Sequence, residues 1–181
     1  MGSFYFVRHG ESEWNVEKKI CGITDIPLTD KGREQARITA AKILEMGIKA
    51  DEIWCSPLKR ARETAEIIAG ITGFPLRVEP RLIEQNFGSY EGKHWNTQEF
   101  FESKQHFADD YDGGESMLRV AQRIYNVIDD VKSSGKTLIL VAHNGIFRSV
   151  RSYFVSETNE EYAASGIPNC EVVEYTWEDQ V

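Results

Sequence analysis

One uninterrupted apolar run constrains the fold of this chain more than any other feature. Residues 137–142 read TLILVA and show no alternation of polar and apolar positions. Such a run is typical of a strand in a parallel sheet that is covered on both faces. Shorter apolar runs at residues 4–7 and 52–55 predict two more strands, and residues 76–79 predict a fourth.

Segments with helical spacing of apolar residues alternate with these strands. The first begins after Thr29, a favourable N-cap, and ends at Gly47, with Leu44 in its apolar stripe. Another is predicted over residues 115–134, with Leu118 in its stripe. Both stripes are predicted to face the sheet.

A further helix is predicted to follow the strand at residues 52–55. Ser56 is its predicted N-cap, Pro57 takes the first helical position, and Gly70 or Gly73 ends it. A last helix is predicted over residues 146–154.

The alternation of strands and helices predicts a three-layer α/β sandwich, with a mainly parallel sheet and helices on both faces. Residues 171–177 alternate between polar and apolar and predict one antiparallel edge strand. The length of 181 residues fits one domain, and we expect residues 1–181 to form it. The turn-rich segment that follows Glu79 is rich in aromatic residues, and loops this long are usually functional.

The composition narrows the classes of partner. The formal net charge is −8, so the chain is expected to bind no nucleic acid, and a phosphorylated ligand would need a local basic cluster. No apolar stretch is long enough to cross a membrane, and no signal peptide is evident. The three cysteines form no CxxC pair, which favours a reducing, cytoplasmic location. The oligomeric state is not indicated.

Two of the four histidines follow directly after predicted strands. His9 comes after the run at residues 4–7, and His143 comes after residues 137–142. In open α/β sheets, ligands bind beyond the carboxyl ends of the strands. One histidine in such a place most often only hydrogen-bonds a neighbour, but two of them, one preceded by Arg8, favour a functional site.

Cations occupy an electrostatically unfavourable place in the helix predicted after Ser56. Lys59, Arg60 and Arg62 lie in its first turns, where the helix dipole disfavours each cation by about 0.3–1 kcal/mol. A bound anion would reverse that sign. Arg60 and Arg8 can grip one phosphoryl group through forked hydrogen bonds, and a histidine facing cations tends to the neutral form that can attack phosphorus.

A phosphoryl transfer to histidine also needs a carboxylic acid that protonates the leaving alkoxide. Glu84, Glu11, Glu13 and Glu91 are all candidates. Spacing alone does not choose among them.

The segment RHGESEWN at residues 8–15 resembles the motif of the histidine phosphatase superfamily, in its phosphoglycerate-mutase-like branch. The remaining motifs follow in the family's order: Gly22–Thr29 with Gly32 and Ala36, Ser56–Leu58 with Arg60, Ala61, Thr64 and Ala65, Leu82–Glu84 with Gly88, Glu91 and Gly92, Gly114–Ser116, and Ala142–His143 with Arg148. The ordered set covers nearly the whole chain, which is far more specific than one tripeptide.

The resemblance implies a mechanism with named residues. His9 would take the phosphoryl group and become phosphohistidine, while Arg8, Arg60 and His143 hold the oxygens of the in-line transition state. Glu84 would protonate the leaving oxygen and then activate water. No metal and no cofactor is implied, because the arginines supply the positive charge.

The substrate side of the site departs from the family pattern in two places. Candidate binding residues are Asn15, Cys21, Gly22, Ile23 and Asn144. Cys21 stands where the family often has Gln, and Asn144 stands where Gly is common. The residues after Glu84 are not basic, which resembles the small phosphatases more than the mutases.

The expected function is therefore a metal-independent phosphomonoester hydrolase that acts on a small phosphorylated metabolite. Phosphoglycerate-mutase-type transfer, a metallohydrolase built on the two histidines and a glutamate, and a phosphate-binding module without turnover remain alternatives. A cysteine phosphatase does not fit, because four residues rather than five separate Cys55 from Arg60. A set of aromatic and ring-bearing residues is expected to line a pocket for a ring-bearing leaving group: Trp14, Phe87, Tyr90, His94 and Trp95.

Overall fold

The apolar run at residues 137–142 forms the middle strand of a five-stranded sheet. In the computed structural model, which describes residues 2–178, this strand is β4 (Leu138–Ala142), and all of its residues are buried. The strand order is β3-β2-β4-β1-β5. The other strands are β1 (Gly2–Arg8), β2 (Glu52–Cys55), β3 (Leu76–Val78) and β5 (Val172–Trp177).

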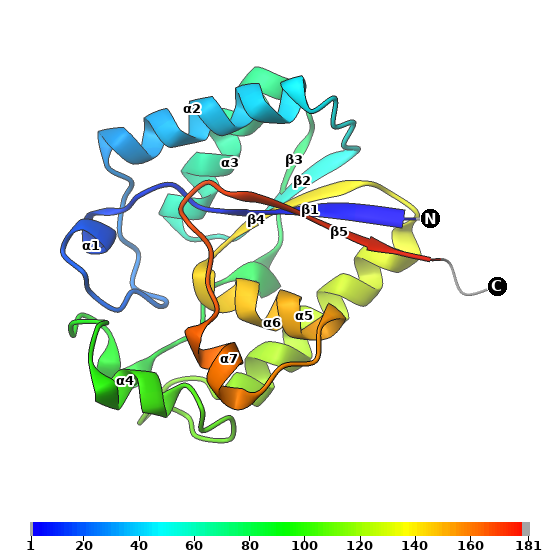
Figure 1. Cartoon of the computed structure of the whole chain (residues 1–181). Coiled ribbons are helices and arrows are strands. Elements are labelled where there is room, and N and C mark those ends of the chain that lie inside the picture. Colours follow the sequence, from blue (N-terminus) through cyan, green and yellow to red (C-terminus); the bar gives the residue numbers. More distant parts are fainter. Residues whose placement is uncertain (1, 179–181) are drawn as a thin grey trace.

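The sheet is mixed, as predicted. β1, β2, β3 and β4 run parallel to one another, and β5 pairs antiparallel with β1 at one edge. Helices cover both faces, with α2 (Asp30–Glu45) and α3 (Lys59–Thr72) on one side and α5 (Met117–Ser134) and α6 (Asn144–Phe154) on the other (Figure 1). The three-layer sandwich is therefore confirmed.

Alternate residues of β4 supply the two apolar cores. Leu138, Leu140 and Ala142 pack in the core that α5 and α6 cover, while Ile139 and Val141 pack in the core under α2 and α3. Both faces of the strand are thus covered, which is why its sequence shows no alternation.

The turn-rich segment contains short helices. η1 (Pro80–Leu82) and η2 (Gly88–Tyr90) are 3-10 turns, and α4 (Gln98–Ser103) lies beside α7 (Asn159–Ala164). The remaining short helix, α1 (Glu13–Val16), follows β1. In Figure 1, α1 and α4 lie on the side of the molecule to which the carboxyl end of β1 points.

The predicted start of α3 was wrong. The helix begins at Lys59 with Leu58 as N-cap, and the hydroxyl of Ser56 instead accepts a hydrogen bond from the Leu58 N–H at 3.3 Å. The free N–H of Lys59 donates to the carboxylate of Asp25 at 2.7 Å. A residue remote in sequence therefore caps the helix, which local capping rules cannot detect. Gly73, with φ of 77°, ends it.

The assignment of two residues to apolar stripes was also wrong. Leu44 is 49% exposed and Leu118 is 57% exposed. Their neighbours Ile43 and Met117 are buried, so Leu44 and Leu118 lie beside the buried stripes of these helices and not in them. Within residues 2–178, no helix is long and apolar enough to cross a bilayer.

Candidate active site

Strand register brings the two histidines together. Arg8 pairs with Ala142 at the ends of the parallel strands β1 and β4, so the residues that follow, His9 and His143, are neighbours. The backbone N–H of His9 donates to the Ala142 carbonyl at 2.9 Å. The two ring centroids lie 5.2 Å apart, beyond the carboxyl ends of the strands, where the sequence predicted a ligand site.

A hydrogen bond fixes the tautomer of His9. Its Nδ1 lies 2.7 Å from the carbonyl oxygen of Gly10, and a carbonyl only accepts, so Nδ1 holds the proton and Nε2 has a free lone pair. Burial, and next the charges of Arg60 and Arg8, lower the pKa of His9 well below its ordinary value. The imidazole is therefore neutral at physiological pH, with Nε2 available as a nucleophile.

The side chain of Ser56 orients His143. Its Nε2 lies 2.7 Å from the Ser56 hydroxyl, while its Nδ1 is buried without a partner among residues 2–178. Burial, and then the charge of Arg60, lower the pKa of His143 well below its ordinary value. Ser56 therefore orients a second neutral imidazole beside His9.

The two predicted arginines are buried and anchored by backbone carbonyls. Arg60 has no exposed surface, and its Nη1 and Nη2 donate to the carbonyls of Thr24 and Gly22 at 2.9 and 2.7 Å. Arg8 donates through Nη1 to the carbonyl of Ile167 at 2.5 Å. Burial lowers the pKa of Arg8 to about 10, so its guanidinium stays charged at pH 7.

Three buried nitrogens of these residues lack partners in the described structure: Nε of Arg8, Nε of Arg60 and Nδ1 of His143. Buried donors are almost always hydrogen-bonded. Groups left unpaired around His9 are therefore suited to accept an anionic ligand.

Glu84 is a buried carboxyl group held by backbone amides. Its Oε1 accepts from the Gln85 N–H at 2.8 Å, and its Oε2 accepts from the Gly145 N–H at 2.9 Å. Burial raises its pKa, although these hydrogen bonds and the charges of Arg60 and Arg148 oppose the rise. A Cβ at position 145 would lie 2.4 Å from Oε1, so glycine is required there for the carboxyl group to sit against the start of α6.

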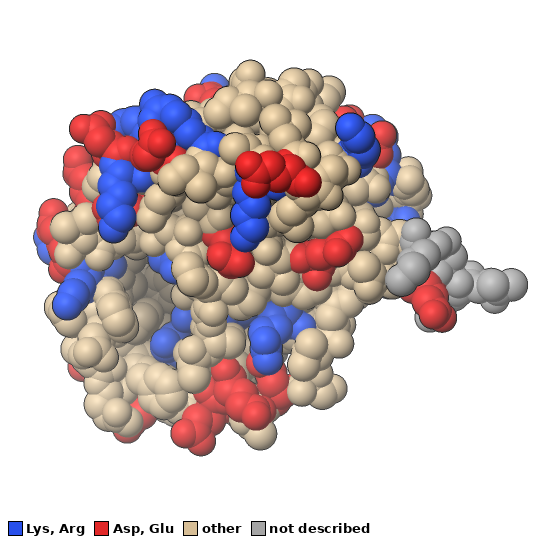
Figure 2. Space-filling view, turned by 45° about the horizontal axis from the view of Figure 1, so that its top comes forward, with Lys and Arg blue, Asp and Glu red and all other residues tan. Residues whose placement is uncertain are grey.

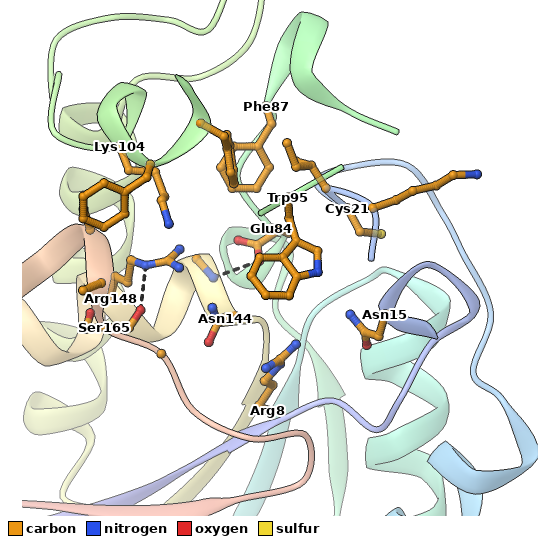
Figure 3. A pocket seen from close by; sticks show the side chains of 18 of the residues that line it. Arg8, Asn15, Cys21, Glu84, Phe87, Trp95, Lys104, Asn144, Arg148 and Ser165 are labelled. Atoms are coloured by element: carbon orange, nitrogen blue, oxygen red, sulfur yellow. Dashed lines mark hydrogen bonds between the residues drawn. The ribbon is translucent and has the colours of Figure 1, made fainter. Parts of the chain in front are cut away.

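His9 and Glu84 open on one cavity of about 600 Å³. Figure 3 shows four side chains pointing into it: Arg8 from the end of β1, Glu84 from the segment after η1, and Asn144 and Arg148 from α6. In the space-filling view, a hollow opens on the face shown, with Lys and Arg side chains around it and inside it (Figure 2). The charged residues among the described cavity walls are Arg8, Lys19, Lys104 and Arg148 against one acid, Glu84. A chain with net charge −8 thus has a basic cavity.

The predicted substrate residues fall into two groups. Asn15, Cys21 and Asn144 line the cavity. Gly22 and Ile23 do not: the Gly22 carbonyl holds Arg60, and Ile23 is 42% exposed with its N–H donating to Glu91 Oε1 at 2.9 Å. This loop therefore positions Arg60.

The predicted aromatic pocket is only partly formed. Phe87 and Trp95 line the cavity together with Phe100 and Phe101, whereas Trp14 and Tyr90 lie outside it, as does His94. Trp95 is 48% exposed at the mouth.

Other residues that shape the site had no role in the sequence analysis. Asn169 donates to the His9 carbonyl at 2.8 Å and to Asn15 Oδ1 at 3.2 Å. Arg148 belongs to the ordered motifs but had no assigned function, and Lys104 had no sequence signal.

Glu91, one of the four acid candidates, accepts from backbone N–H groups of the loop near Arg60 and does not line the cavity. Glu11 is bound to Lys31 at 2.8 Å and does not line it either. Among residues 2–178, no group of three or more His, Cys, Asp or Glu side chains is arranged to hold a metal ion.

The carboxyl ends of β1 and β4 thus bring together a buried neutral histidine, arginines with unpaired donors and a carboxyl group of raised pKa, a set of groups suited to phosphoryl chemistry. Residues 4–181 match the model of the histidine phosphatase superfamily (branch 1), and the chain belongs to this family. It is an enzyme of the histidine phosphatase type.

Individual relatives agree in fold and family. The chain is 37% identical over 150 residues to the probable phosphoglycerate mutase GpmB of Escherichia fergusonii, covering 77% of this chain and 68% of that protein. It is 35% identical over 158 residues to the putative phosphoserine phosphatase 2 of Hydrogenobacter thermophilus, covering 83% and 77%.

Among solved structures, a phosphoserine phosphatase mutant of Entamoeba histolytica superposes with a TM-score of 0.83 at 26% identity, covering 98% and 92% of the two chains. The phosphoglycerate mutase of Thermus thermophilus superposes with a TM-score of 0.76 at 31% identity, covering 97% and 93%.

Proposed function

We propose that this protein is a metal-independent phosphomonoester hydrolase that works through a phosphohistidine at His9, on a small phosphorylated metabolite. The observation that carries the proposal is the hydrogen bond from His9 Nδ1 to the Gly10 carbonyl. It leaves the Nε2 lone pair free in a buried site that Arg8 and Arg60 make electropositive.

In the first step, His9 Nε2 attacks the phosphorus and forms a P–N bond as the bond to the leaving oxygen breaks. We expect the unpaired donors of Arg8, Arg60 and His143 to take up the charge on the phosphoryl oxygens, a contribution that is large in a buried site. Arg8 lines the cavity, whereas Arg60 and His143 have no exposed surface and are not part of its described lining. Asn15 lines the same cavity and offers an amide to the same group.

Glu84 supplies the proton that the leaving alkoxide needs. A carboxyl group retains its proton to higher pH when its pKa is raised, as burial raises that of Glu84. In the second step the resulting carboxylate takes a proton from water, the hydroxide oxygen bonds to phosphorus, and the P–N bond breaks to release inorganic phosphate.

Phosphoryl transfer back to an organic acceptor, as in a mutase, uses the same first step. The identity to a probable phosphoglycerate mutase supports this second candidate. We favour water as the acceptor, because the residues that follow Glu84 are not basic and in this resemble the small phosphatases.

A phosphomonoester panel assayed in EDTA tests the proposal. We expect the native chain to release inorganic phosphate and the His9→Ala variant to release none. Loss of activity in EDTA, full activity of His9→Ala, or an isomerised phosphoester without phosphate release would contradict it.

A further inference from the structure

Four basic residues line the catalytic cavity, and one of them, Lys19, is paired with Glu17. Arg8 forms no ion pair among the described residues, but it adjoins His9, where the phosphoryl group is proposed to bind. Lys104 and Arg148 form no ion pair within residues 2–178. They lie on the same side of the cavity, from the end of α4 and from α6 (Figure 3).

The hydrogen bonds of Arg148 leave its charged end free. It is only 8% exposed, and its Nε donates to the Ser165 carbonyl at 2.9 Å. No hydrogen bond within residues 2–178 involves its two terminal nitrogens, which point into the cavity in Figure 3. Two acids lie close enough to act on Arg148 through their charge, Glu84 and Glu157. Glu84 accepts from two backbone N–H groups, and Glu157 is paired with Arg151 at 3.0 Å, so neither forms an ion pair with Arg148.

Lys104 is similarly unpaired. Its amine lies 5.2 and 5.5 Å from the ring centroids of Phe100 and Phe101 and forms no hydrogen bond within residues 2–178. In Figure 3 its amine points toward Arg148. Burial, and next the charge of Arg148, lower the pKa of Lys104 to about 7. Two like charges brought together under partial burial cost stability unless an anion joins them.

We propose that Lys104 and Arg148 form a second anion subsite, and that the substrate is a small phosphomonoester with a carboxylate or other second anionic group. This inference rests on the proposed function, because the first anion is the phosphoryl group at His9. Amine and guanidinium donors on one side of a cavity of about 600 Å³ suit a compact molecule that carries a second anionic group besides its phosphoryl group.

The phosphoryl group cannot itself fill this subsite while it reacts. In Figure 3, Arg8 and Asn15 lie away from Lys104, on the other side of Glu84 and Asn144. The phosphoryl group would occupy the part near Arg8, and the second anion would point toward α4. The aromatic side chains of Phe87 and Trp95 would cover the carbon chain between them.

Matched substrate pairs test the subsite. The ratio of kcat/KM for 3-phosphoglycerate to that for glycerol 3-phosphate isolates one carboxylate on one carbon skeleton, and phosphoserine against phosphoethanolamine repeats the comparison. Glycerol 1,3-bisphosphate tests whether a second phosphate group can replace the carboxylate. We expect the native chain to favour the member of each pair that carries the second anionic group by about tenfold or more.

The variants assign that preference to Lys104. We expect Lys104→Met to reduce the ratio at least fivefold, mainly through KM, and Lys104→Arg to restore it. Lys93→Met is the matched control, because Lys93 also lies over an aromatic ring, Tyr90 at 4.7 Å, but outside the cavity; it should keep the native ratio.

Two results would overturn the subsite: a native ratio near one, or a Lys104→Met variant that keeps the native ratio. Either would leave the hydrolase intact if the compounds are still hydrolysed. Failure of the native chain to hydrolyse any member of the pairs would instead refute the proposed function.

Discussion

Replacement of Glu84 by glutamine separates its chemical role from its structural one. The carboxyl group accepts two backbone N–H groups, from Gln85 at 2.8 Å and from Gly145 at 2.9 Å. A glutamine side chain has one acceptor oxygen, so its NH₂ group must face one of these donors. One buried N–H then loses its partner, which costs about 1–3 kcal/mol in the free energy of unfolding.

The catalytic loss should depend on the leaving group. Without a proton donor, hydrolysis of alkyl phosphates should slow by about 10²–10⁴-fold. p-Nitrophenolate leaves without protonation, so hydrolysis of p-nitrophenyl phosphate should slow by less than about tenfold. The assay is kcat for glycerol 3-phosphate and for p-nitrophenyl phosphate with each protein at one pH, together with urea unfolding.

Glu79→Gln is the matched control. Glu79 is a buried carboxyl group, 3% exposed, that accepts from the N–H and the side chain of Arg81 outside the cavity. It should lose stability without changing the ratio of the two rates. Equal losses for both substrates in Glu84→Gln would refute the role of Glu84 as the acid.

Three other perturbations test separate parts of the site. Arg60→Ala should lower kcat by about 10²–10³-fold, as loss of a preorganised charge contact does. A native kcat for p-nitrophenyl phosphate in this variant would show that Arg60 has no role in the reaction. Gly145→Ala would place a Cβ 2.4 Å from Glu84 Oε1 and should slow alkyl phosphates, whereas Gly70→Ala, with nothing within 4 Å, should not; equal kcat in the two variants would contradict the packing. Folding lowers the pKa of His9 and His143, so below about pH 6.5 the unfolded chain binds more protons than the folded chain. The free energy of unfolding therefore decreases as the pH is lowered, by up to about 1.4 kcal/mol per pH unit for each histidine. Urea unfolding between pH 7 and 5.5 should give a shallower slope for His143→Gln than for the native chain, and an unchanged slope would show that His143 is not buried neutral.

The sequence was sufficient to predict how the strands place the two histidines. β1 and β4 are apolar runs that end at Arg8 and Ala142, and parallel pairing then makes the following residues neighbours. This inference needs only strand type and the rule that ligand sites lie at carboxyl ends. The choice of Glu84 among four acids came from the family resemblance, and the structure places it, unlike Glu11 and Glu91, in the cavity wall.

Contacts between loops could not be predicted. Asp25 rather than Ser56 caps α3, and the carbonyls of Gly22 and Thr24 hold Arg60, because turns remote in sequence pack together. Local spacing contains no information on such pairs. Lys104 lies in a segment without clear periodicity, so its position in the cavity wall emerges only from the packing of α4 against α7.

Direct detection of the intermediate tests the central claim, that the phosphoryl group passes through Nε2 of His9. The native chain is mixed with a ³²P-labelled substrate, quenched in alkali, in which phosphohistidine survives, and digested for mass spectrometry. We expect transient label on His9 alone, lost on incubation with water at the rate of turnover and absent in His9→Ala. Label on any other residue, or turnover by His9→Ala at the native rate, would contradict the mechanism.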